Sequence, residues 1–192
     1  MAYFESGYSP VSRHRPTMPP TRPAPAELIQ FLGAYDANIQ RLALAARAAV
    51  IREAPDAAEF IYDASNAVSV GFSLSGKPSE HFVHVATYAG WVNLGFNFGT
   101  SLPDPLKRLQ GDGNRIRHLR LTGAIDLRDP YLVGLVQEAI DRARRGDIPT
   151  AAEVTVVAVS GPKRRPAKAL AKSAGTKKRV AVTRAKPKAK KK

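Results

Sequence analysis

Seven residues in the middle of the chain have side chains that together could bind a small molecule. If the strands predicted around them pair in sequence order, all seven project from one side of a sheet. Two aromatic rings would supply apolar walls, while two imidazoles, an amide and a guanidinium would supply convergent polar groups, the mixture typical of small-molecule sites. A guanidinium beside an imidazole could hold a carboxylate or a phosphate. The residues of this candidate ligand face are Ser69, Phe82, His84, Trp91, Asn93, His118 and Arg120.

The same face could serve other purposes. It could be a dimer interface, or it could be covered by the N-terminal segment or by the segment after Gly146. The sequence leaves these alternatives open, and with them the oligomeric state and the identity of any ligand.

The histidines also raise the question of a metal site. His81 and His84 are three positions apart on a predicted strand, so they should point to opposite faces and should not bind one ion. His84 and His118 could share an ion, but no nearby acid offers a third ligand. We therefore predict no metal site and no cofactor.

Two short motifs resemble catalytic loops without completing them. The segment 71–75, Gly-Phe-Ser-Leu-Ser, begins like the nucleophile elbow of a serine hydrolase but lacks its final glycine and the helix that should follow. The segment 111–115, Gly-Asp-Gly-Asn-Arg, lacks the Lys-Ser/Thr pair of a phosphate-binding loop. Because no other pair of residues suggests catalysis, we predict a non-enzymatic protein.

A basic tail accounts for the whole net charge of +14. Residues 162–192 contain 14 Lys or Arg and no acid, whereas residues 1–161 contain 16 basic and 16 acidic residues. Such asymmetry is typical of an interaction tail on a globular domain. The basic residues of the tail are Lys163, Arg164, Arg165, Lys168, Lys172, Lys177, Lys178, Arg179, Arg184, Lys186, Lys188, Lys190, Lys191 and Lys192.

The composition of the tail predicts its partner. Its cations alternate with Ala, Pro, Ser and Thr, so it cannot bury apolar surface and should be disordered alone. Polycations of this kind bind phosphates by releasing counterions. The tail has no aromatic residue that could stack on bases, so we predict binding to nucleic acid without sequence preference. A solubilising tail, or one directed at anionic membrane or at the ribosome, is the alternative.

Bulk composition limits the compartment. No apolar run approaches the roughly 20 residues that span a bilayer, and the N-terminus lacks the basic start and apolar stretch of a secretory signal. The chain has no cysteine and hence no disulfide framework. These features predict a cytoplasmic protein without a membrane partner, associated with the nucleoid if the tail binds DNA.

The hydrophobic pattern predicts the elements that position the candidate ligand face. Alternating apolar residues indicate strands at 59–62, 67–74 and 116–121 and a hairpin within 81–97, and a β-branched run at 154–159 could add an edge strand. Helical stripes and capping residues indicate helices at 26–33, from Asp36 to before Pro55, and from Pro130 to about 145, with a short helical turn at 104–111. This order predicts an α+β fold, an antiparallel sheet of about five strands covered on one face by N- and C-terminal helices.

Four segments follow from this pattern. We expect a disordered proline-rich leader at 1–25, an α+β domain at 26–148, a linker or edge strand at 149–161 and the disordered basic tail at 162–192.

An ordered series of short motifs resembles the YdhG-like family, a bacterial domain of unknown function. The series covers roughly 42–142 and includes Asn-Ala-Val-Ser-Val-Gly-Phe at 66–72, His-Phe-Val-His-Val at 81–85, Trp-Val-Asn-Leu-Gly-Phe at 91–96, Leu-Pro-Asp-Pro at 102–105, Leu-Gln-Gly-Asp-Gly at 109–113 and Ile-Arg-His at 116–118. The resemblance implies a small α+β fold. One branch of the family is described as a frataxin-like iron chaperone, a role that depends on clustered surface carboxylates, whereas the acids of this chain are dispersed. The tail is similar in composition to the Lys- and Ala-rich extensions of histone-like proteins.

Two functions therefore remain in view. The first is a non-enzymatic YdhG-like domain that the basic tail tethers to nucleic acid. The alternative is a carrier of a small ligand or of a metal such as iron, acting through the candidate ligand face.

Overall fold

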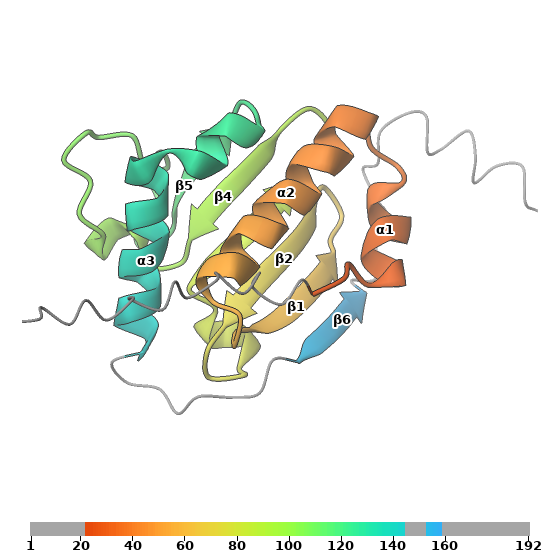
Figure 1. Ribbon diagram of the computed structural model, residues 1–192, viewed down its shortest axis with the longest axis horizontal. Coiled ribbons are helices and arrows are strands. Elements are labelled where there is room, and N and C mark those ends of the chain that lie inside the picture. Colours follow the sequence, from red (N-terminus) through yellow and green to blue (C-terminus); the bar gives the residue numbers. More distant parts are fainter. Residues whose placement is uncertain (1–21, 145–152, 159–192) are drawn as a thin grey trace, which may run out of the picture.

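The computed structural model describes residues 22–144 and 153–158, and these residues form an α+β fold (Figure 1). A single six-stranded sheet has the strand order β5-β4-β3-β2-β1-β6. The strands are β1 (Ala58–Asp63), β2 (Val68–Ser73), β3 (Val83–Thr87), β4 (Val92–Phe96), β5 (Arg117–Leu121) and β6 (Val154–Ala158). The α-helices are α1 (Ala26–Leu32), α2 (Ala37–Glu53) and α3 (Pro130–Arg144), and the 3-10 helices are η1 (Pro78–Glu80), η2 (Gly99–Ser101) and η3 (Ala124–Arg128).

The α+β class is confirmed, and the predicted antiparallel sheet of about five strands agrees with β1 to β5, but the complete sheet is mixed. Strands β1 to β5 pair in sequence order and are all antiparallel, as expected. The sixth strand, β6, pairs with β1 in the parallel direction, so the sheet is mixed. A β-branched run favours an extended backbone but carries no information about strand direction. The sequence could therefore suggest this strand without fixing its orientation.

Helix α2 starts and ends where its flanking residues predict. The carboxylate of Asp36 accepts a hydrogen bond of 2.8 Å from the backbone N–H of Asn38, which caps α2. Helix α2 ends at Glu53, two residues before Pro55. In Figure 1 the α-helices lie together on one face of the sheet.

The hydrophobic core lies between this face and the helices. One side of strands β1 to β5 contributes buried residues, such as Phe72 of β2, Val85 of β3 and Leu94 of β4. They pack with buried residues of the helices, including Val50 of α2 and Val136 of α3. The alternation of apolar and polar residues along the strands thus separates a packed face from the opposite face that carries the candidate ligand residues.

The short helical turn predicted at 104–111 is reduced to one turn, in which the N–H of Lys107 donates to the carbonyl of Asp104 at 3.0 Å. Asp104 does act as a cap, because its carboxylate accepts hydrogen bonds of 2.9 Å from the N–H groups of Arg108 and Leu109. The chain nevertheless leaves the helical region at Lys107, where φ is +51°, and then pairs with β5 through an isolated bridge between Gln110 and His118. Pairing with the sheet edge replaces the hydrogen bonds that a longer helical segment would have made.

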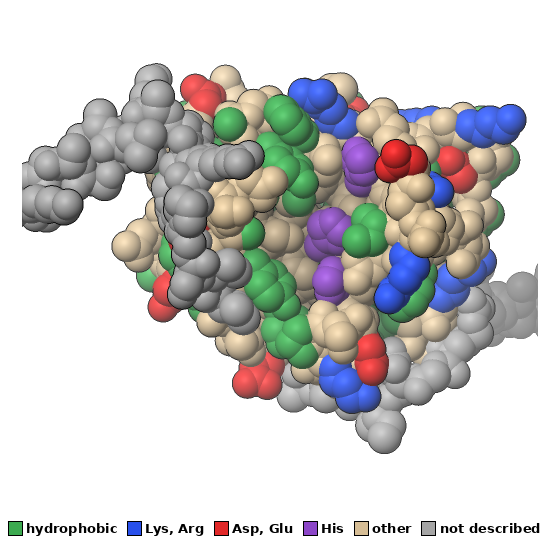
Figure 2. All heavy atoms as spheres, turned by 180° about the vertical axis from the view of Figure 1, so that it is seen from behind, with side chains coloured by type: hydrophobic (Ala, Val, Ile, Leu, Met, Phe, Trp, Pro, Cys, Tyr) green, Lys and Arg blue, Asp and Glu red, His purple; other side chains and the backbone are tan. Residues whose placement is uncertain are grey.

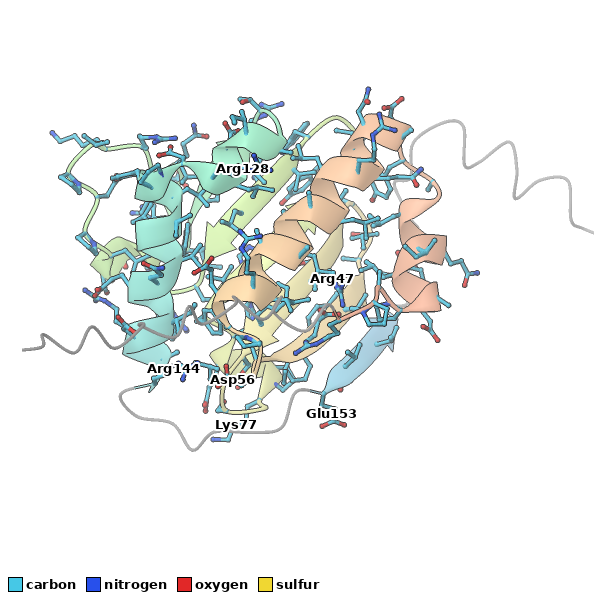
Figure 3. The ribbon with its side chains drawn as sticks, viewed as in Figure 1. Arg47, Asp56, Lys77, Arg128, Arg144 and Glu153 are labelled. Atoms are coloured by element: carbon cyan, nitrogen blue, oxygen red, sulfur yellow. The ribbon has the colours of Figure 1, made fainter. Side chains whose placement is uncertain are left out.

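A buried ion pair between α2 and β1 was not predicted. The guanidinium of Arg47, a side chain of α2 that is labelled in Figure 3, donates to both carboxylate oxygens of Glu59, at 2.9 and 3.2 Å. Both side chains are almost completely buried. The same guanidinium donates to the backbone carbonyls of Arg22 and Pro23, each at 3.1 Å. The Arg22 side chain donates in turn to the carbonyls of Pro55 and Ala57. Residues 22–25, the end of the segment predicted as a leader, are thereby held against the domain.

Helix length bears on membrane insertion. None of the helices in the described residues combines the length and the apolar character that a bilayer span requires.

Candidate functional site

Two rows of residues run across the face of the sheet opposite the helices, which we call the helix-free face (Figure 2). The register of the antiparallel strands defines both rows, because residues paired across strands point to the same side. The first row is Tyr62, Ser69, Ala86, Asn93 and Arg120. The second row is Phe60, Gly71, His84, Gly95 and His118.

Five of the seven residues predicted for the candidate ligand face lie in these rows. Asn93 and Arg120 are direct cross-strand partners in the first row, and His118 lies beside Gly95 in the second. Trp91 directly precedes β4 and contacts Arg120, whose Cζ lies 4.6 Å from the centre of the indole ring. The sequential pairing that the prediction assumed is the reason these side chains come together.

Phe82 is the exception. Its side chain is 3% exposed and belongs to the hydrophobic core cluster, so it forms no wall of the helix-free face. Strand β3 begins only at Val83, and the alternation that was extended back to Phe82 does not hold outside the strand.

His81 takes part in the helix-free face, against the prediction. It follows η1 and precedes β3, and its Nδ1 lies 2.7 Å from the carbonyl oxygen of Pro78. Its ring meets the ring of His84 edge to face, with centroids 5.5 Å apart. The prediction that the two rings point to opposite faces is therefore wrong, because the parity rule applies only within regular strands.

Two glycines make room for the imidazoles. A Cβ atom placed on Gly95 would lie 2.2 Å from Nε2 of His84, and one on Gly71 would lie 3.3 Å from Cγ of His81. Each ring thus extends over the bare backbone of a neighbouring strand. Figure 2 shows the three histidine side chains of the described residues grouped in the middle of this face.

His84 is neutral at physiological pH. Burial lowers its pKa from 6.5 to about 4, and repulsion from His81 lowers it further, whereas Asn97 lies close enough to favour the charged ring. The pKa of His118 is also lowered by partial burial. The Nδ1 atom of His84 and the Oδ1 atoms of Asn93 and Asn97 are enclosed without a hydrogen bond, which is uncommon for buried polar atoms.

The pKa of His84 predicts a loss of stability in acid. This pKa is lower in the folded chain than in the unfolded one. The contribution of neutral His84 to the free energy of unfolding is therefore complete above pH 6.5 and is lost as the pH falls toward 4. A shift of this size corresponds to roughly 3 kcal/mol of unfolding free energy. The free energy of unfolding, measured with urea, should differ less between pH 7 and pH 4 for His84→Gln than for the unaltered protein.

Histidine-selective NMR gives the direct control for this prediction. The His84 ring should titrate about two units below an unperturbed histidine. Titration of His84 near pH 6.5 would contradict a lowered pKa for this residue. The same conclusion would follow if the stability of His84→Gln and that of the unaltered protein depended equally on pH.

Aromatic–arginine pairs flank the histidines at the two ends of β4. Trp91 also stacks on Tyr88, with ring centroids 5.1 Å apart and planes inclined by 22°. At the other end the guanidinium of Arg115 lies over the ring of Phe98, with Cζ 4.7 Å from its centre. The Phe98–Arg115 pair was not singled out in the sequence, because neither residue lies in a strand and only the fold brings them together.

Charge is unevenly distributed between the two faces. Neither cross-strand row contains a carboxylate, while Glu59 and Asp63 of β1 alternate with row residues and are buried toward the helices. The described residues contain 13 Lys or Arg and 14 Asp or Glu, so the domain is close to neutral as a whole. In the described part of the chain, no group of three or more His, Asp or Glu is arranged to hold a metal ion.

No family model, no curated protein and no solved structure matches this chain. The resemblance to the YdhG-like family therefore stays a prediction. The basic residues predicted to bind nucleic acid, at 163–192, lie outside the described residues, as do residues 1–21 of the predicted leader.

Proposed function

We propose that the protein binds nucleic acid without sequence preference, as a non-enzymatic domain tethered through the basic residues of 162–192. The separation of charge along the chain carries this proposal. All of the excess positive charge is in the tail, whereas the described domain carries nearly equal numbers of acids and bases. A segment of 14 cations without an acid is attracted to polyanions and has no apolar stretch that would insert into a membrane. The proposal places the protein in the cytoplasm, at the nucleoid when its partner is DNA.

A salt titration tests this proposal on the full-length chain. If half of the 14 cations engage phosphates of duplex DNA, the logarithm of the binding constant should fall with the logarithm of salt concentration with a slope of roughly −6. Two duplexes of equal length and unrelated sequence should give the same affinity. A slope near zero would refute the proposal.

A carrier of small anions is the second candidate. It is favoured by the exposed guanidinium of Arg120 on the helix-free face, since a guanidinium can hold a carboxylate or a phosphate through charge-assisted hydrogen bonds. Inorganic phosphate or a dicarboxylate should then raise the melting temperature, and Arg120→Ala should abolish the rise, whereas Arg128→Ala on η3 should not. Equal behaviour of the two variants would exclude this candidate.

A further inference from the structure

The two ends of β4 present exposed aromatic rings that already stack on arginines. Trp91 is 36% exposed and Phe98 is 47% exposed. Arg120 and Arg115 respectively lie over these rings, at 4.6 and 4.7 Å. Six residues separate Trp91 from Phe98, and β4 accounts for five of them, so the two pairs lie beyond opposite ends of one strand.

The surface between these pairs is suited to a negatively charged partner. It holds His84 and His118 and no carboxylate within either cross-strand row. Glu80, which lies near this surface in η1, is paired with Lys77 at 3.1 Å. Because the pKa values of both imidazoles are lowered, the positive charge of the two rows comes from Arg120, and no carboxylate of the rows opposes it.

We propose that single-stranded nucleic acid binds by stacking bases on the Trp91–Arg120 pair of the helix-free face and on the Phe98–Arg115 pair beyond the other end of β4. Stacking on aromatic rings and guanidinium planes is how proteins hold unpaired bases, and it tolerates any sequence because every base has a π-face. A duplex cannot use such a surface, because its bases are already stacked and paired. The inference rests on the proposed function, since the tail would hold the phosphates of the same strand and keep it near this face.

The single tryptophan of the chain is a built-in probe for this proposal. Trp91 is the only tryptophan, so its emission reports on this face alone. The full-length protein is titrated with single-stranded DNA, single-stranded RNA and duplex DNA of equal length. We expect both single strands or one of them to quench Trp91 emission, and the duplex to bind through the tail without quenching. A preference between DNA and RNA would name the natural partner.

Matched substitutions separate this face from the tail. Arg120→Ala and Phe98→Ala should each weaken single-strand binding about fivefold or more and leave duplex binding unchanged. Arg128→Ala and Ile125→Ala remove an exposed arginine and a 72% exposed apolar side chain of η3, so they serve as controls and should change neither affinity. A thermal melt of each variant, measured alongside, should match that of the unaltered protein because all four side chains are exposed.

The outcomes distinguish this inference from the proposed function. If single strands bind without changing Trp91 emission, and Arg120→Ala behaves like Arg128→Ala, the helix-free face does not bind bases and only the tail proposal stands. If a mononucleotide quenches as strongly and with the same affinity as an oligonucleotide, the face is a small-molecule site and the inference is wrong. If neither single strands nor duplex bind the full-length protein, both proposals fail.

Discussion

Replacement of Arg47 by leucine should lower the free energy of unfolding by about 3–5 kcal/mol, the cost typical of removing one partner from a buried ion pair. The reason is the position of Glu59, whose side chain has no exposure to solvent. Without Arg47 its nearest cation is the guanidinium of Arg22, at 3.8 Å. The carbonyls of Arg22 and Pro23 would also lose a donor. Urea unfolding at neutral pH measures the difference.

Two further variants make this prediction specific. Arg128→Leu removes an exposed arginine from η3 and should change stability by no more than about 0.5 kcal/mol. The double replacement Arg47→Leu and Glu59→Leu should recover much of the loss, because apolar residues often replace a buried ion pair without net cost. The interpretation is wrong if the single Arg47 variant is no less stable than the Arg128 control.

Neutralisation of the tail should have the largest effect on binding. Replacing all 14 Lys and Arg of 162–192 by Gln in the full-length chain should weaken binding to duplex DNA at least about a thousandfold in low salt. Each lost cation leaves a phosphate with its counterion still condensed, so the gain in counterion entropy disappears. The slope of the salt dependence should approach zero in the same variant. Fluorescence anisotropy of a labelled duplex measures both quantities.

A scrambled tail provides the matched control. A chain with the same residues of 162–192 in random order keeps the charge and loses any motif. Its affinity and salt slope should equal those of the unaltered protein, because counterion release depends on charge and not on sequence. If scrambling alone abolishes binding, the tail acts through a specific motif. If the neutral tail still binds duplex tightly, the contacts lie in the domain.

The regular elements could be predicted because their signals are local. Alternation along β2, β3 and β4 defined which residues face the helices, and the cap at Asp36 and the prolines at Pro55 and Pro130 defined helix ends. Pairing in sequence order then placed His84, beside Gly95, and His118 on one face. This part of the candidate site needed only short-range rules.

The remaining features depend on contacts between distant segments. The direction of β6 and the burial of Arg47 with Glu59 are set by tertiary packing. Neither secondary-structure propensity nor hydrophobic periodicity carries information about such packing. Phe82 was predicted on the helix-free face, where His81 lies instead, and this difference has another cause. It follows from the exact residue at which β3 begins, and strand ends are less sharply marked than strand centres.

The isolated bridge beside β5 limits how the sheets of two neighbouring copies could join. Gln110 exchanges both backbone hydrogen bonds with His118, at 2.8 and 2.9 Å, near the start of β5, the strand at this edge of the sheet. The side chains of Arg117 and Arg120 add like charges to the same strand. The β5 edge therefore does not offer a continuous row of free backbone groups. The sheets of neighbouring copies cannot form an uninterrupted hydrogen-bond ladder across it. If the protein binds nucleic acid as proposed, copies held close together on it should not join through their β5 strands into a fibre.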